Sequence, residues 1–203
     1  MINIYLEPIM EYKLIVIGAS AGGMEALKNL LPVFPPAFPV PIVIVQHISS
    51  LSNGFMIQYL NSISSVRVKE AEEKEPLCAG TVYFAPPNYH LLIEDDQTLS
   101  LTVEKKVNYA RPSIDVLFES AAYTYGNALI GVVLTGANND GAKGLATIKK
   151  AGGFTIVQSP ETAYSDSMPR SAIEATTPDM IIPIEEIAIV LRDLFMKKPN
   201  QFI

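Results

Sequence analysis

The sequence has little of what marks secreted, metal-binding or membrane-spanning proteins. It contains one cysteine, Cys78, so no disulfide can form within the chain and we expect a reducing compartment. No run of about eighteen apolar residues is present, and the N-terminal segment lacks the basic and apolar regions of a signal peptide. No cluster of possible ligands has the spacing of a zinc site. We therefore expect a cytoplasmic protein that needs no metal and no cofactor, and does not insert into a membrane.

The charge and the length narrow the possibilities further. The formal net charge of −6 disfavours nucleic acid as a partner. With 49% hydrophobic and 18% charged residues, the chain can bury a sizeable core. We find no internal repeat, low-complexity segment or linker. The sequence therefore predicts one domain over residues 1–203, with a core of about residues 13–194.

Strand and helix signals alternate along the chain. "KLIVIG" (13–18) and "PIVIVQH" (41–47) are near-continuous β-branched runs, typical of parallel strands covered on both faces, and "MEALKNLLPVF" between them is helical in composition. Residues 66–103 differ, because short alternating runs broken by turn residues favour an antiparallel meander. The predicted fold class is α/β: a doubly wound, mostly parallel sheet with an inserted antiparallel hairpin or meander.

A glycine-rich turn follows the first predicted strand. Its glycines, at 18, 22 and 23, do not fit a dinucleotide fingerprint, and no lysine stands where a phosphate-binding P-loop needs one. "GASAG" instead matches G-x-S-x-G, the nucleophile elbow, in the required strand–turn–helix context. Ser20 is then a candidate nucleophile. The alternative is an ordinary helix N-cap.

A serine nucleophile needs a base, and the chain has two histidines. His47 ends the second strand, where an open α/β sheet places functional groups, so it is the candidate base; a hydrogen-bonded strand end is the alternative. His90, in "PPNYHLLI", is structural or faces the substrate, and is the reserve base. Asp140, in "TGANNDGAKG" after a later strand, is the candidate for the carboxylate that orients the imidazole, with a plain helix N-cap as the alternative.

Six sequence blocks then carry a family resemblance: "IGASAGGMEAL", "IVQHIS", "YFAPPNYHL", "RPSIDVLFES", "VVLTGANNDGAKGL" and "MPRSAIEA". In this order they resemble the catalytic domain of the CheB chemotaxis methylesterase family, from about Lys13 to about Leu194. The resemblance implies a protein-glutamate methylesterase, often also a glutamine deamidase, that acts on bacterial chemoreceptors. It implies that Ser20 is the nucleophile, His47 the base and Asp140 the orienting carboxylate.

The resemblance also implies the surroundings of these groups. We expect backbone N–H groups near Ala21 and Ala137 to hold the oxyanion. Arg111 either pairs with a local carboxylate or meets acidic receptor helices. The expected partner is a methylated chemoreceptor or related signalling protein as substrate, and a sensor kinase or methyltransferase is a further candidate. The oxyanion and substrate-binding residues expected in total are Ala21, Ala137, Asn138, Asn139, His90 and Arg111.

The chain departs from the family at several places. Family members commonly carry an N-terminal receiver domain, but only residues 1–12 precede the first predicted strand here, so we expect none. Ala21 stands where a threonine is often found and Ala137 where a methionine is usual, and "ISSLSNGF" after His47 lacks the proline-containing stretch. Two other functions stay open: a non-catalytic docking module, and a serine esterase that acts on a different ester.

Overall fold

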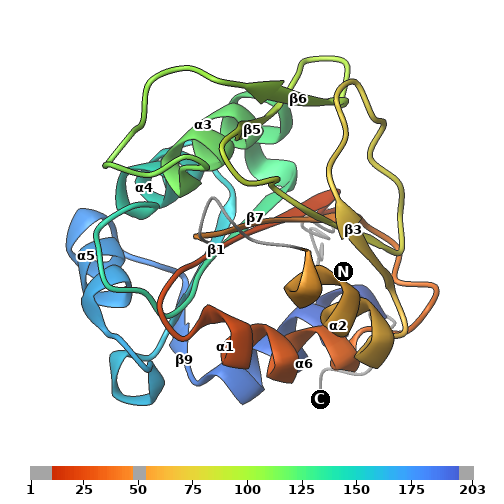
Figure 1. The fold of residues 1–203 in the computed structure, drawn as a ribbon. Helices are drawn as coiled ribbons and strands as arrows, with labels where there is room; N and C mark the ends of the chain where they lie inside the picture. Colours follow the sequence, from red (N-terminus) through yellow and green to blue (C-terminus); the bar gives the residue numbers. More distant parts are fainter. Residues whose placement is uncertain (1–10, 48–53, 197–203) are drawn as a thin grey trace, which may run out of the picture.

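A parallel sheet of seven strands organises the part of the chain that the computed structural model describes, residues 11–47 and 54–196. The strand order is β3-β4-β2-β1-β7-β8-β9. Figure 1 labels several of these strands. In that order the strands are Arg67–Glu70, Thr81–Phe84, Ile42–Gln46, Leu14–Ala19, Leu129–Val133, Phe154–Gln158 and Met180–Ile182. Two further strands, β5 (His90–Ile93) and β6 (Leu99–Thr102), form an antiparallel hairpin outside this sheet.

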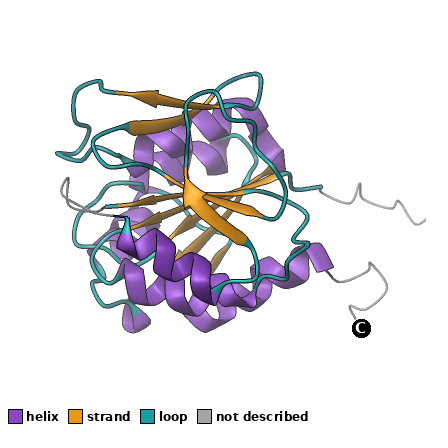
Figure 2. Ribbon diagram, turned by 45° about the vertical axis from the view of Figure 1, so that its right-hand side comes forward, coloured by secondary structure: helices purple, strands orange, loops and turns teal. Residues whose placement is uncertain are grey.

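Helices cover both faces of the sheet, as the edge-on view in Figure 2 shows. One layer holds α1 (Gly23–Leu30), α2 (Phe55–Ile63) and α6 (Ile184–Met196), and the other holds α3 (Ile114–Tyr125), α4 (Ala142–Lys150) and α5 (Ser167–Ala175). Three short 3₁₀ segments, η1 (Leu31–Val33), η2 (Gly126–Ala128) and η3 (Pro160–Thr162), lie in connections between elements. None of the helices in the described residues is both long enough and apolar enough to cross a membrane.

The central strand β1 shows why a continuous apolar run correctly predicted a parallel strand. All of its residues are buried. Ile15 and Ile17 pack into the core beneath α1, α2 and α6, whereas Leu14 and Val16 pack into the core beneath α3, α4 and α5. A strand covered on both faces has no solvent side, so its sequence does not alternate. The predicted doubly wound α/β fold is confirmed.

The predicted meander over residues 66–103 is only partly right. β3 pairs with β4 in parallel, and β4 pairs with β2 in parallel, so both belong to the main sheet. Only β5 and β6 are antiparallel. The connection between β3 and β4 contains no helix. The sequence therefore lacks the helical signal that usually marks a parallel crossover, and its short strands favoured the wrong pairing.

The direction of sheet growth reverses at β1. The chain moves from β1 to β2 on one side and later returns to place β7 on the other side. In open α/β sheets, the crevice at such a reversal, outside the carboxyl ends of the strands, is where ligands bind. The segment that departs from the family pattern directly after His47 falls on residues 48–53, outside the described residues.

Candidate active site

Hydrogen bonds between loops carry the sheet one residue beyond the strands at its carboxyl edge. The N–H of His47, after β2, donates to the carbonyl of Ala19 at 3.0 Å. The N–H of Ser20, after β1, donates to the carbonyl of Thr135, after β7, at 2.9 Å. Ser20 and His47 are therefore neighbours because their backbones extend the parallel ladder of β1 and β2.

The His47 imidazole lies between Ser20 and Asp140. Its Nδ1 is 3.2 Å from Ser20 Oγ, and its Nε2 is 2.9 Å from Asp140 Oδ2. The His47 side chain is 15% exposed, and that of Asp140 is fully buried. An ionised carboxylate only accepts hydrogen bonds, so the ring proton lies on Nε2 and the lone pair of Nδ1 faces the serine hydroxyl. The ring nitrogens are used in the opposite sense from the serine protease template, in which Nδ1 faces the aspartate.

The Asp140 carboxylate is held by donors from three other segments. Besides His47, it accepts hydrogen bonds from Ser113 Oγ (2.8 Å), the backbone N–H groups of Ile114 (2.7 Å) and Asp115 (3.2 Å), and Asn108 Nδ2 (3.1 Å). Burial raises the pKa of Asp140, but hydrogen bonds led by that from His47 outweigh it, so the pKa lies below its ordinary value. The carboxylate is therefore ionised where it faces the imidazole.

The alternative interpretation of Asp140 as the cap of the helix that follows it is wrong. The N-cap of α4 is Gly141, with φ 92, and the Asp140 side chain makes no capping hydrogen bond to α4. Asp140 instead accepts the N–H groups of Ile114 and Asp115, which begin α3. The positive end of the α3 dipole stabilises the ionised carboxylate, so a helix distant in the sequence contributes to the electrostatics of the site.

Asn138 links His47 to the loop that carries Asp140. Its Oδ1 accepts the backbone N–H of Asp140 at 3.1 Å, which directs its Nδ2 towards His47 Nδ1 at 3.2 Å. Asn138 and Ser20 therefore both donate to the lone pair of the same imidazole nitrogen. Asn139 points elsewhere: it is exposed and lines a separate hollow between α4 and α5, so the structure does not bring it to Ser20.

The turn around Ser20 depends on two glycines. Gly22 has φ 81 and precedes α1, and a Cβ there would lie 2.5 Å from Tyr164 Cβ. Gly136 passes so close that its Cβ would lie 2.9 Å from Ser20 Cβ. Within the described residues, the backbone N–H groups of Ala21 and Ala137, adjacent to these glycines, donate to no protein acceptor. They are available to an oxyanion.

A cavity of about 520 Å³ opens over Ser20 and His47. The loop before α3 forms much of its wall and contributes Tyr109, which is 96% exposed, and Arg111. Arg111 Nη1 donates to the carbonyls of Val103 (2.6 Å) and Glu104 (2.8 Å). Its partners within the described chain are thus backbone carbonyls, and the predicted pairing with a local carboxylate is wrong.

His90 does not reach the cavity. It is 1% exposed, its Nε2 donates to the carbonyl of Lys105 at 3.1 Å, and its Nδ1 accepts the N–H of Ser113 at 3.2 Å. The ring ties the loop before α3 to the start of that helix. The expectation that His90 faces the substrate or serves as a reserve base is therefore wrong, because burial and two backbone partners fix both of its nitrogens.

Four further polar residues at the site had not been expected: Gln46, Asn108, Ser113 and Asp115. Gln46 Nε2 donates to the carbonyls of Ser20 and His47, both at 2.9 Å, and so links the loop of Ser20 to the loop of His47. A polar residue ending the apolar strand "PIVIVQ" was the available signal for Gln46. Asp115 looked like an ordinary acid in a first helical turn, and Asn108 like a loop residue, so neither carried a signal of its own.

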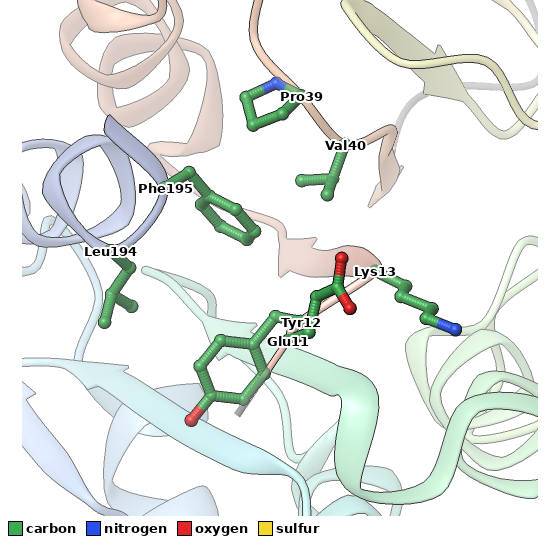
Figure 3. A pocket seen from close by; sticks show the side chains of 7 residues that line it. All are labelled: Glu11, Tyr12, Lys13, Pro39, Val40, Leu194 and Phe195. Carbon is green, nitrogen blue, oxygen red and sulfur yellow. The ribbon is translucent and has the colours of Figure 1, made fainter. Parts of the chain in front are cut away.

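A second cavity, of about 540 Å³, lies at the opposite end of β1 (Figure 3). Figure 3 shows Phe195 of α6 facing Tyr12 and Val40 across it. No histidine lies beside a hydroxyl or thiol among the described residues that line it. Within residues 11–47 and 54–196, no group of three or more His, Cys, Asp or Glu gathers as metal ligands would. The cavity over Ser20 is therefore the candidate active site.

Comparisons with known proteins indicate one family. A family model described as CheB methylesterase matches residues 15–191. The chain is 55% identical over 179 residues to a putative protein-glutamate methylesterase/protein-glutamine glutaminase of Leptospira interrogans, covering 88% of this chain and 93% of that protein. It is 37% identical to the protein-glutamate methylesterase FrzG of Myxococcus xanthus, covering 91% of this chain and 55% of that protein.

A solved structure gives the same result. The crystal structure of the Thermotoga maritima CheB methylesterase catalytic domain matches with a TM-score of 0.86 and 36% identity, covering 91% of this chain and 99% of that chain. The chain thus spans nearly all of the Leptospira relative and of the Thermotoga catalytic domain, but about half the length of other curated relatives.

Proposed function

The chain belongs to the CheB methylesterase family, and from this membership we propose that it hydrolyses glutamate methyl esters on a chemoreceptor-like signalling protein. The observation that carries the proposal is the continuous hydrogen-bond series from Ser20 Oγ through the His47 ring to Asp140, at the floor of an open cavity. The family membership supports the ester chemistry, and the geometry supports the roles proposed for Ser20 as nucleophile, His47 as base and Asp140 as orienting carboxylate.

In the first half of the proposed reaction, Ser20 Oγ attacks the ester carbonyl carbon and its proton passes to Nδ1 of His47, 3.2 Å away. Asp140 stabilises the imidazolium that forms. The N–H groups of Ala21 and Ala137 receive the oxyanion of the tetrahedral intermediate. The bond to the methoxy oxygen then breaks, and His47 gives its proton to the departing methanol.

In the second half, water attacks the acyl group on Ser20 and gives a proton to His47. The bond to Ser20 Oγ breaks, and the serine recovers its proton from His47. The glutamate side chain leaves as a carboxylic acid, which releases its proton to solvent to give the carboxylate. These steps need no metal or cofactor. The same acyl-enzyme forms from a glutamine side chain with ammonia as the leaving group, so deamidation is the second activity we propose; the Leptospira relative's name includes it.

The rim of the cavity favours a polypeptide over a small ester. Tyr109, in the cavity wall, is 96% exposed. Tyr164, which is next to Gly22 and is not one of the residues that line the cavity, is 84% exposed. Exposed tyrosines beside a reacting group are typical of surfaces that contact another protein. A cytoplasmic location, and a methyltransferase reaction that supplies the ester, are part of the same proposal.

Release of methanol from a methylated receptor tests the proposal. The protein is incubated with a chemoreceptor carrying radiolabelled methyl esters, and volatile methanol is counted. Release by the native protein and its loss in Ser20→Ala support the proposal. Ser62→Ala is the matched control, because it removes a surface hydroxyl on α2 that donates only to the carbonyl of Tyr59. Hydrolysis of a small methyl ester but not of the receptor indicates an esterase of another class, and hydrolysis of neither indicates a docking module.

A further inference from the structure

The N-termini of α3 and α4 meet at Asp140. A carboxylate next to each helix caps the N-terminus of the other helix. Asp140, which precedes α4, accepts the N–H groups of Ile114 and Asp115 at the start of α3, at 2.7 and 3.2 Å. Asp115, in the first turn of α3, accepts the N–H groups of Gly141 and Gly144 at the start of α4, at 3.0 and 2.7 Å. The reciprocal caps fix Asp140 relative to both helices.

Asn108 bridges the two carboxylates. Its Nδ2 donates to Asp115 Oδ2 at 2.8 Å and to Asp140 Oδ1 at 3.1 Å. Its backbone has φ 50, in the left-handed region that asparagine adopts more readily than most residues. Both acids are buried, so they repel one another in a poorly solvated place. The two protons of one amide group reduce that repulsion by giving each acid a donor.

The pKa values of the two acids at the junction are shifted in opposite directions. Burial raises the pKa of Asp115 against the hydrogen bond from Gly144, and the nearby charge of Asp140 raises it further. The pKa of Asp140 is instead held below its ordinary value. The two acids at one junction are therefore not equivalent, and the one in contact with His47 has the lowered pKa.

We propose that Asn108 is a positioning residue of the reaction: together with Asp115, it holds the Asp140 carboxylate in the orientation that keeps Oδ2 on His47 Nε2. Without the bridge, Asp140 Oδ1 loses one of its donors and faces the Asp115 carboxylate directly, so the acid turns away from the imidazole. The proposal rests on the proposed function only in using Ser20 and His47 as the reacting pair.

Asn108→Gly tests the bridge, because glycine keeps the left-handed backbone and removes only the amide. The first readout is the downfield proton resonance of His47 Nε2–H, assigned by its loss in His47→Ala. The second is the rate at which a fluorophosphonate labels Ser20: the bond from Oγ to phosphorus forms, fluoride leaves, and the serine proton passes to His47. We expect the resonance to move upfield and labelling to slow roughly 10- to 100-fold.

Gln97→Gly is the matched control. Gln97 is an amide residue with φ 65 in the turn between β5 and β6, and its side chain contacts Tyr125 rather than the site. We expect both readouts to match the native protein. An unchanged resonance in Asn108→Gly would overturn the proposal, whatever the labelling rate.

A double variant separates positioning from direct contact with the substrate, since Asn108 also borders the cavity. If Asn108 acts through Asp140, Asn108→Gly adds no further loss to Asp140→Asn. A full additional loss would mean that Asn108 acts on the substrate and not through Asp140, and would overturn the proposal. Asp115→Asn, which places an amide against the Asn108 amide, repeats the test should Asn108→Gly fail to fold.

The test does not depend on the substrate. The fluorophosphonate reports any activated serine, so slower labelling in Asn108→Gly supports the bridge even if glutamate methyl esters are not hydrolysed. No labelling of the native protein would contradict the proposed nucleophile, and the resonance would still decide whether Asn108 holds Asp140.

Discussion

The two ends of β1 open into cavities of nearly equal volume, about 540 Å³ at the amino end and about 520 Å³ at the carboxyl end. Aromatic rings pack against one another at the amino end. The ring centroids of Tyr12 and Phe154 are 5.9 Å apart, and those of Phe195 and Phe38 are 5.2 Å apart. The carboxyl end is bordered by buried polar side chains that bond to the loop backbones. Cavity size therefore does not distinguish a site in this fold; chemistry does.

The orientation of the helices explains the difference. In a parallel sheet, each helix that follows a strand begins at the carboxyl edge, so unpaired N–H groups and positive dipole ends gather there. Those groups attract carboxylates and oxyanions. Asp140, for example, accepts hydrogen bonds from the first backbone N–H groups of α3. At the amino edge, helices end and strands begin, and nothing comparable favours an anion near Tyr12.

We expect removal of Ser20, the proposed nucleophile, to give the largest difference between the two ends of β1. We expect Ser20→Ala to lower kcat on the order of 10³- to 10⁶-fold, and the addition of His47→Ala to cost little more, because the groups act as a unit. Phe195→Leu at the amino-end cavity should leave kcat within about twofold. Initial rates of methanol release measure both. Near-normal turnover by Ser20→Ala would rule out this serine as nucleophile.

Neutralising the carboxylate should cost less than removing the serine. Asp140→Asn should lower kcat on the order of 10⁴-fold at most, by analogy with serine proteases, because the amide favours the wrong imidazole tautomer while the fold survives. Circular dichroism checks the fold, and kcat is measured per folded molecule. If the variant unfolds but its folded fraction keeps full activity, Asp140 serves only to cap α3.

Removing Gln46, which links the loops of Ser20 and His47, should lower activity less than Asp140→Asn does. It should also lower stability measurably. Gln46→Leu leaves the carbonyls of Ser20 and His47 without their buried donor, so we expect a loss of about 1–3 kcal/mol in the free energy of unfolding. We expect kcat to fall roughly tenfold as the loops separate. Urea unfolding and initial rates measure the two effects. Thr155→Val, on the buried part of β8, should lower stability alone.

The two acids at the α3–α4 junction should give the smallest effects. As pH changes, their contributions to the free energy of unfolding should change in opposite directions. The pKa of Asp140 is lowered in the folded state, so its stabilisation is present above the unfolded value of about 3.9 and is lost as pH falls through the folded value. The difference in unfolding free energy between the native protein and Asp140→Asn should therefore narrow below about pH 4.

Asp115 should behave in the opposite way. Its pKa is raised in the folded state, so its contribution is fully present below about pH 3.9 and is lost as pH rises through the folded value. The stability difference between the native protein and Asp115→Asn should shrink as pH rises from that point. Urea unfolding at several pH values measures both variants, and equal slopes for the two would contradict the different roles assigned to the acids.

Much of the framework was readable from local sequence. The apolar runs that became β1 and β2 predicted parallel strands, and the G-x-S-x-G turn and the strand-end His47 pointed to the carboxyl edge where the structure places them. The family resemblance is confirmed by the match over residues 15–191. These signals were available because strand patterns and tight turns depend on residues close together in the chain.

The sequence determined which elements form and which chemical groups stand at the strand ends, since both follow from side-chain pattern and turn geometry over a few residues. Only the tertiary structure decided the parallel pairing of β3 with β4, the burial of His90, and the capping of α3 by Asp140. The same is true of the Asn108 bridge between Asp115 and Asp140. Most of these contacts join residues outside a single helix or strand, and their free energy arises only when packing removes both partners from water. Local sequence patterns therefore do not predict them.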